Sequence, residues 1–219
     1  MSADATGQPR HLPMFPLGTV LFPGEGLPLV VFEPRYRTMT RECLAGDRQF
    51  GVVLIERGHE VGGGDTRVLT GTVAEIAEVE EVPDGRFFLI TVGRARVRVL
   101  EWLPDDPYPH ALVETLPEPE PGQAVDETLA ERIQAAERAV RRALALVAEL
   151  GIDAGALKGL PIADDPNRAL WQLCAKAPVG PFDRQRLLEA ATTAERATLL
   201  EELASDAAEL FALRLADGP

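Results

Sequence analysis

Apolar residues in the first half of the chain fall into short runs that proline and glycine separate. Such runs cover 12–15, 20–22 and 27–32, and a turn at 23–26 separates the last two. This punctuation predicts short strands that end at fixed turns. The continuous run at 50–55 is typical of a strand buried on both faces. We expect the core to include Phe15, Leu17, Val20, Phe22, Leu29, Val31 and Phe32.

One helix is predicted over 34–45, between these strands. Pro34 suits the first helical turn, where its missing N–H costs nothing. Gly46 is a suitable stop for the helix. The apolar face of the helix is expected to carry Tyr36, Met39 and Cys43.

The pattern over 71–82 leaves helix and strand open. Apolar residues recur there at every third position, which favours a helix. The β-branched side chains and the bounding Gly71 and Pro83 favour a strand instead. After a turn at 83–85, a further strand is predicted over 86–92.

Residues 94–99 alternate strictly and place Arg94, Arg96 and Arg98 on one face of a predicted strand. A stripe of arginines is one way to bind the phosphates of nucleic acid. The alternative is a solvated sheet face on which the arginines pair with acidic residues of 75–81. The net charge of −13 favours this second interpretation. With a last strand at 111–116, the strands predict a barrel or a sandwich.

The composition changes at 117–122, where proline and glutamate alternate and predict a stiff spacer. Beyond it, apolar residues recur at steps of three and four, as in amphipathic helices. Helices are predicted over 123–150, 165–176, 182–189 and from 192 onward, where Thr192 and Glu195 fit a capping box. We therefore predict a disordered start at 1–10, a barrel at 11–117, a linker at 118–124 and a helical subdomain at 125–217.

The sequence predicts no catalytic, cofactor or metal site. Nucleophilic catalysis needs a nucleophile held against a base, and no serine lies in such a motif. The cysteines and histidines lack the spacing of a zinc site. The glycines of 57–67 are not followed by Lys-Ser/Thr, so a flexible loop is expected in place of a phosphate cradle. The residues considered are Ser2, Ser205, His11, His59, His110, Cys43 and Cys174.

Composition also bears on location and partners. No apolar run approaches the roughly 18 to 20 residues of a membrane helix. An acidic chain without a basic half is a poor candidate for binding nucleic acid or anionic membranes. Cys43 and Cys174 lie far apart in predicted helices, so we expect free thiols and a cytoplasmic protein.

The stretch at 12–36, LPMFPLGTVLFPGEGLPLVVFEPRY, resembles the start of the LON amino-terminal domain, the substrate-recognition domain of Lon proteases. The resemblance covers about 12–116, and the helical continuation from 160 to 189 is also similar to that family. It implies an α+β fold, a PUA-like β-barrel followed by an α-helical bundle, with 71–82 as a strand. Further similar segments are FGVVLI (50–55), GTVAEI (71–76), DGR (84–86), GRARVRV (93–99) and PY (107–108).

A Lon protease also has an ATPase module and a serine–lysine peptidase domain. The sequence contains no glycine-rich loop ending in Lys-Ser/Thr, and neither Ser2 nor Ser205 fits a dyad. We therefore expect a standalone LON-domain protein. A peptidase label given by family name would not confer proteolytic activity on it.

The resemblance implies a non-catalytic module that binds peptides, unfolded protein or a protein partner, as an adaptor or a chaperone-like factor. Exposed aromatic anchors would supply the affinity. Our candidates are Phe22, Trp102 and Tyr108, which lie beside proline-rich segments, and core packing is the alternative for each. An RNA-binding module is the second hypothesis, because PUA-like barrels include such modules, and the arginine stripe is its support.

Overall fold

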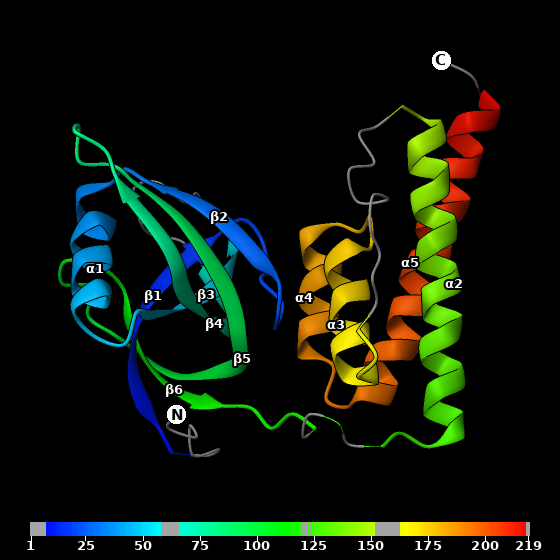
Figure 1. Cartoon of the computed structure of the whole chain (residues 1–219), viewed down its shortest axis with the longest axis horizontal. Helices are drawn as coiled ribbons and strands as arrows, with labels where there is room; N and C mark the ends of the chain where they lie inside the picture. Colours follow the sequence, from blue (N-terminus) through cyan, green and yellow to red (C-terminus); the bar gives the residue numbers. More distant parts are fainter. Residues whose placement is uncertain (1–7, 58–65, 120–121, 123, 152–162, 218–219) are drawn as a thin grey trace. The chain divides into compact units, whose positions relative to one another are not determined.

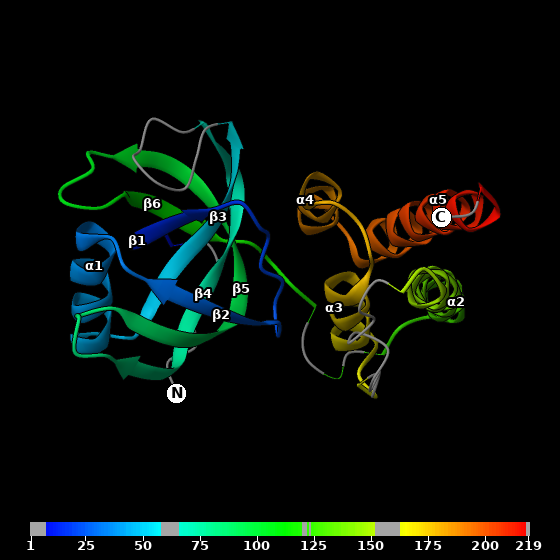
Figure 2. The same ribbon diagram turned by 90° about the horizontal axis from the view of Figure 1, so that it is seen from above.

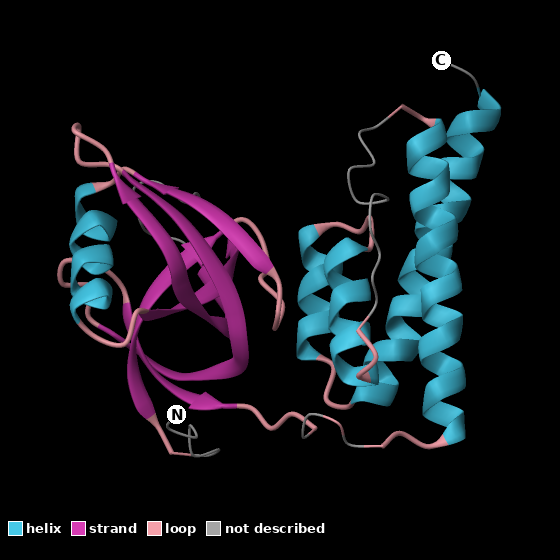
Figure 3. Cartoon of the chain, viewed as in Figure 1, coloured by secondary structure: helices cyan, strands magenta, loops and turns pink. Residues whose placement is uncertain are grey.

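The computed structural model describes residues 8–57, 66–119, 122, 124–151 and 163–217 (Figure 1). The chain divides into two compact units, Met1–Glu118 and Pro119–Pro219. Strands and one helix build the first unit, and the described elements of the second unit are all helices (Figure 3). Ser2, His59 and most of the predicted glycine-rich loop lie outside the described residues, as do parts of the predicted N-terminal segment and linker.

The first unit is a six-stranded sheet of order β2-β5-β4-β3-β1-β6. β6 pairs with both β1 and β5, so the sheet closes on itself and leaves β2 outside the ring (Figure 2). β1 and β3 run parallel, and the other pairs are antiparallel. The predicted α+β fold with a closed barrel is confirmed. Its elements are β1 (Arg10–Leu17), β2 (Gly26–Val31), α1 (Pro34–Ala45), β3 (Gln49–Arg57), β4 (Thr66–Glu81), β5 (Phe87–Leu103) and β6 (His110–Thr115).

Residues 71–82 belong almost wholly to the 16-residue strand β4, as the family resemblance implied. The register of β4 against β5 shifts between Thr72 and Ala74 and again between Ile76 and Glu78. Each shift changes which side chains face the core, because a β-bulge reverses the alternation of a strand. The recurrence of apolar residues at every third position of 71–82 is therefore explained by bulges in a strand and does not indicate a helix. The apolar run at 20–22, in contrast, is buried without forming a strand.

Two clusters of buried side chains hold the first unit together, and β1 contributes to both. Phe15 and Leu17 point into the cluster that α1 covers, and Leu12 and Met14 point into the other. The Phe15 ring stacks on Tyr36 of α1 at a centroid distance of 4.2 Å. The predicted helix face is confirmed, because all three of its side chains are buried: Tyr36, Met39 and Cys43.

The predicted core residues are buried or partly buried with one exception. Phe32 is exposed, so its assignment to the core is wrong. The side chains of Pro28 and Val30 in β2 point away from the core, and Phe32 continues that alternation one residue beyond the strand.

Gly93 marks the point at which β5 passes from β2 to β6. Its N–H donates to the C=O of Glu25 at 2.9 Å, and its C=O accepts from the N–H of Gly24 at 2.8 Å. A Cβ at this position would overlap the carbonyl oxygen of Phe22 and lie 2.9 Å from its carbonyl carbon. Only glycine therefore permits this approach of the two backbones.

The second unit contains four described helices, of which α2 and α5 pack along each other (Figure 2). The predicted capping box is present, since Thr192 Oγ1 accepts from the N–H of Glu195 at 3.1 Å and the Glu195 carboxylate accepts from the N–H of Thr192 at 3.2 Å. No helix in the described ranges has both the length and the apolar content needed to cross a bilayer. The helices are α2 (Glu127–Glu149), α3 (Pro166–Lys176), α4 (Pro181–Glu189) and α5 (Thr193–Asp217).

A buried arginine joins three of these helices. Arg196 of α5 is almost fully buried, and its guanidinium carbon lies 3.7 Å from the centroid of the Trp171 ring of α3. It also donates to the C=O of Leu187 in α4 and of Ala190 just after it, both at 3.2 Å. The charge is thus held by hydrogen bonds and an aromatic face.

We expect Gly93→Ala to lower the free energy of unfolding by about 2 to 3 kcal/mol, because the added methyl forces two backbones apart. Gly26→Ala is the matched control, since a Cβ there lies 4.0 Å from the nearest atom, the C=O oxygen of Thr91. Urea unfolding followed by Trp102 fluorescence in a Trp171→Phe background measures the first unit. Equal stability of the two variants would contradict the close approach.

We expect Arg196→Ala to destabilise the second unit by about 3 kcal/mol, because it removes the hydrogen bonds to two carbonyls and leaves a cavity beside Trp171. The control is Arg186→Ala on α4, whose side chain is largely exposed and pairs with Asp183. That variant should change stability by less than about 1 kcal/mol. Urea unfolding monitored by helical circular dichroism provides the comparison, and similar midpoints for both variants would overturn the assignment.

Candidate functional site

Two of the three aromatic anchors predicted from the sequence are buried. Phe22 is 0% exposed and Tyr108 is 2% exposed. The Tyr108 hydroxyl donates to the carboxylate of Glu42 in α1. Burial, followed by that hydrogen bond, raises the pKa of Tyr108 above its ordinary range. The expectation that these two rings are exposed is therefore wrong, because both form part of the packed interior.

Trp102 is only partly buried, beside the cluster that contains Leu12 and Met14. The guanidinium carbon of Arg67 lies 4.6 Å from the centroid of the Trp102 ring, and Arg67 also pairs with Asp105 at 3.4 Å. A role for Trp102 in binding a partner stays a prediction. Trp102 packs beside one buried cluster, and Tyr108 belongs to the other.

The three arginines of the β5 stripe are each paired with a carboxylate. Arg94 forms two hydrogen bonds to Glu75, at 3.0 and 2.8 Å, and these lower the pKa of Glu75. The stripe therefore offers no uncompensated arginine, and the RNA-binding hypothesis loses its residue-level support. The pairs are Arg94–Glu75, Arg96–Glu118 and Arg98–Glu114, of which only the first lies on the predicted segment 75–81.

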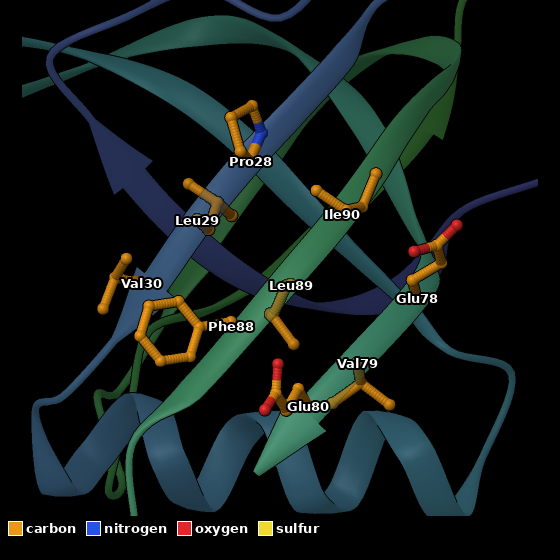
Figure 4. A pocket seen from close by; sticks show the side chains of 9 residues that line it. All are labelled: Pro28, Leu29, Val30, Glu78, Val79, Glu80, Phe88, Leu89 and Ile90. Carbon is orange, nitrogen blue, oxygen red and sulfur yellow. The ribbon is translucent and has the colours of Figure 1, made fainter. Parts of the chain in front are cut away.

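An exposed apolar surface lies on β2 and β5, on the side of the sheet that α1 does not cover. Val30 is 49% exposed, Phe88 is 40% exposed and Ile90 is 43% exposed. Together with Pro28 these residues form what we call the apolar face. Figure 4 shows their side chains gathered on the two strands, with Glu78 and Glu80 on the adjacent strand β4. A patch of this kind on a sheet marks a candidate interaction site.

Strand register places the apolar face and the two carboxylates in two rows. Because register partners on one face lie side by side, each row runs from an apolar residue of β2 through β5 to a glutamate of β4. Next to the apolar face is a hollow of about 480 Å³. The rows are Val30–Phe88–Glu80 and Pro28–Ile90–Glu78.

Backbone pairing also shapes this surface. Among the described strands, β2 pairs only with β5. In an antiparallel ladder, hydrogen-bonded residue pairs alternate with pairs that are not hydrogen-bonded. Since the N–H of Gly93 donates to the C=O of Glu25, the backbone groups of Gly26, Pro28 and Val30 point away from β5. Pro28 has no N–H to present there. The exposed edge of β2 therefore lacks a hydrogen-bond donor at its middle position.

The sequence carried one signal for this face. The run at 86–92 is apolar at almost every position, as is the run at 27–32. Such runs are expected for strands buried on both faces. In the structure β2 is outside the ring and the first half of β5 lies beside it, so only one face is covered. The run at 27–32 also contains a proline, which is typical of an edge strand and therefore indicated that one of its apolar faces could be exposed.

The described residues contain no group of three His, Cys, Asp or Glu side chains arranged to hold a metal ion. In the part of the chain that the structure describes, Cys43 and Cys174 are both buried and neither forms a disulfide. Burial, with Asp47 and Glu42 nearby, raises the pKa of the Cys43 thiol to about 12. A thiol of this kind is a poor nucleophile at neutral pH.

Comparison with known proteins gives a consistent result. The family model of the ATP-dependent protease La (LON) substrate-binding domain matches residues 11–206. The chain is 30% identical over 199 residues to a Lon protease of Cytophaga hutchinsonii and 29% identical over 213 residues to Lon protease 2 of Herpetosiphon aurantiacus. The matches cover 89% and 93% of this chain and 24% of each relative, so the chain spans about a quarter of their length.

Solved structures show the same fold. A Lon N-terminal domain protein from Xanthomonas campestris matches with a TM-score of 0.63 and 26% identity, covering 85% of this chain and 94% of that one. The N-terminal domain of a Lon protease of the Mycobacterium avium complex matches with a TM-score of 0.57 and 20% identity, covering 90% and 99%. The family resemblance predicted from the sequence is confirmed.

We expect neither cysteine of the folded protein to react with an aromatic disulfide reagent at pH 8. With a pKa of about 12, only about one Cys43 thiol in ten thousand is ionised at that pH, and burial blocks access to both side chains. Absorbance of the released thiolate should rise only when denaturant is added. A Cys174→Ala variant isolates Cys43, and rapid reaction of its native state would contradict the burial of this thiol.

Proposed function

This chain belongs to the family of ATP-dependent protease La (LON) substrate-binding domains, and on that premise we propose that it binds unfolded polypeptides through their exposed apolar segments. The apolar face is the binding surface in this proposal. It is supported by three large side chains that stay between 40% and 49% exposed next to a hollow. An isolated exposed apolar residue is ordinary, but a contiguous group beside a hollow is typical of an interaction site.

The site suits a ligand without a fixed sequence. Aliphatic and aromatic side chains of a ligand gain affinity from burial at about 25 cal/mol per Å² of apolar surface, whatever their order along the chain. The surface also lies on strands, so that its side chains are held before the ligand arrives and little ordering is needed on binding.

In this proposal the chain binds polypeptides and does not hydrolyse them. The matching family is a substrate-binding domain, and the matched part of the curated Lon proteases is about a quarter of their length. Neither Ser2 nor Ser205 lies in a motif that pairs a nucleophile with a base. We therefore propose an adaptor or chaperone-like role for this substrate-binding module.

Trp102 is a secondary candidate for partner contact. Its ring is partly exposed and lies under the guanidinium of Arg67, away from the residues that line the hollow. Phe22 and Tyr108 could contact a partner only if the core opened, since both are buried.

We expect the double variant Val30→Asp/Phe88→Asp to bind unfolded polypeptide about tenfold more weakly, because charge replaces the two central apolar contacts. The probe is fluorescein-labelled lysozyme that has been reduced and carboxamidomethylated, and fluorescence anisotropy measures its dissociation constant.

Leu100→Asp is the matched control, because Leu100 is also exposed on β5 but does not line the hollow. Circular dichroism and thermal unfolding establish that each variant is folded. Trp102→Ala tests the secondary candidate and should change affinity by less than the double variant does. Undiminished binding by a folded Val30→Asp/Phe88→Asp variant would refute the apolar face as the site, and no binding by the unaltered protein would refute the proposed function.

A further inference from the structure

The charged residues that line the hollow beside the apolar face are both negative. Glu78 and Glu80 line the hollow on the β4 side. From this arrangement we propose that the face selects polypeptide segments that carry Lys or Arg next to their apolar side chains. This inference rests on the proposed function and specifies its substrate class: cationic apolar segments are preferred over acidic apolar segments of equal hydrophobicity.

The two carboxylates are in reach of a ligand seated on the apolar face. Glu80 is the register partner of Phe88, and Glu78 is the register partner of Ile90. Directly opposite residues of an antiparallel pair have Cβ atoms about 4.5 to 5.5 Å apart. A ligand side chain that packs on Phe88 or Ile90 therefore places its neighbours next to a carboxylate.

Other charges close to the face are already paired within the protein. Glu81, at the end of β4, forms an ion pair with Arg41 of α1 at 2.7 Å. Arg86, whose guanidinium carbon lies 6.0 Å from the centroid of the Phe88 ring, pairs with Asp84 at 2.7 Å.

Glu75, which precedes this end of β4, pairs with Arg94. Within the described residues, Glu78 and Glu80 take part in no ion pair. They are therefore the uncompensated charges of this surface, and a ligand cation is the partner that their chemistry fits.

The exposure of Glu78 and Glu80 determines how strongly the face should prefer cationic over acidic segments. Both carboxylates are exposed, so each contributes like a surface ion pair and the apolar contacts supply most of the affinity. An acidic segment meets repulsion from the same two groups. The net charge of −13 adds long-range attraction for cationic segments and repulsion for acidic ones, which salt screens.

The test compares two fluorescein-labelled peptides that share one apolar core and differ only in carrying lysine or glutamate at the flanking positions. The unaltered protein should bind the lysine peptide about fivefold more tightly at low salt, and the difference should shrink at about 0.5 M salt. Glu78→Lys/Glu80→Lys should reverse the preference. The matched control is Glu56→Lys/Glu101→Lys, which makes the same change in net charge at exposed positions that do not line the hollow.

Reversal in Glu78→Lys/Glu80→Lys with retention in the control supports the inference. Equal affinity of the unaltered protein for both peptides would overturn it and leave the proposed function standing. The same reversal in both variants would also overturn it, because net charge and not these two residues would then set the preference. Binding of neither peptide by the unaltered protein would overturn the proposed function itself.

Discussion

The contact between Gly93 and the carbonyl of Phe22 is the constraint on which the first unit depends. At this point β5 lies against the turn that leads into β2, and hydrogen bonds to Gly24 and Glu25 hold the two segments together. On one side of Gly93 the strand pairs with β2, and on the other it pairs with β6 to close the ring. A single strand thus belongs both to the barrel and to the exposed sheet beside it. The apolar face exists because the closing strand continues past the ring.

Local patterns in the sequence predicted those features that depend on neighbours along the chain. The face of α1 that carries Tyr36 and Met39 follows from a spacing of three and four residues, and the capping box at Thr192 follows from two residue types. Periodicity alone did not identify the strand at 71–82, because its bulges interrupt the alternation of side chains between the two faces. Its identity came from the family resemblance.

Features that depend on distant segments were harder to predict. Phe22 and Tyr108 lie beside prolines, which usually indicates a surface loop, yet Tyr108 is fixed by Glu42, 66 residues away. The apolar face was missed for a similar reason. A strand that is apolar on both sides has the same sequence pattern whether one or both of its faces are covered. Only the pairing order shows that β2 lies outside the ring.

Under the proposed function, Pro28 also bears on aggregation at the edge of the sheet. A surface that attracts unfolded chains also brings their unpaired backbones close to an edge strand, which is the template that aggregation uses. Proline in the middle of β2 interrupts the row of donors along that edge. A chain that added to this edge as a further strand would lack one backbone hydrogen bond at Pro28. In the proposed function, Pro28 therefore both contributes to the apolar face and opposes strand addition at its edge.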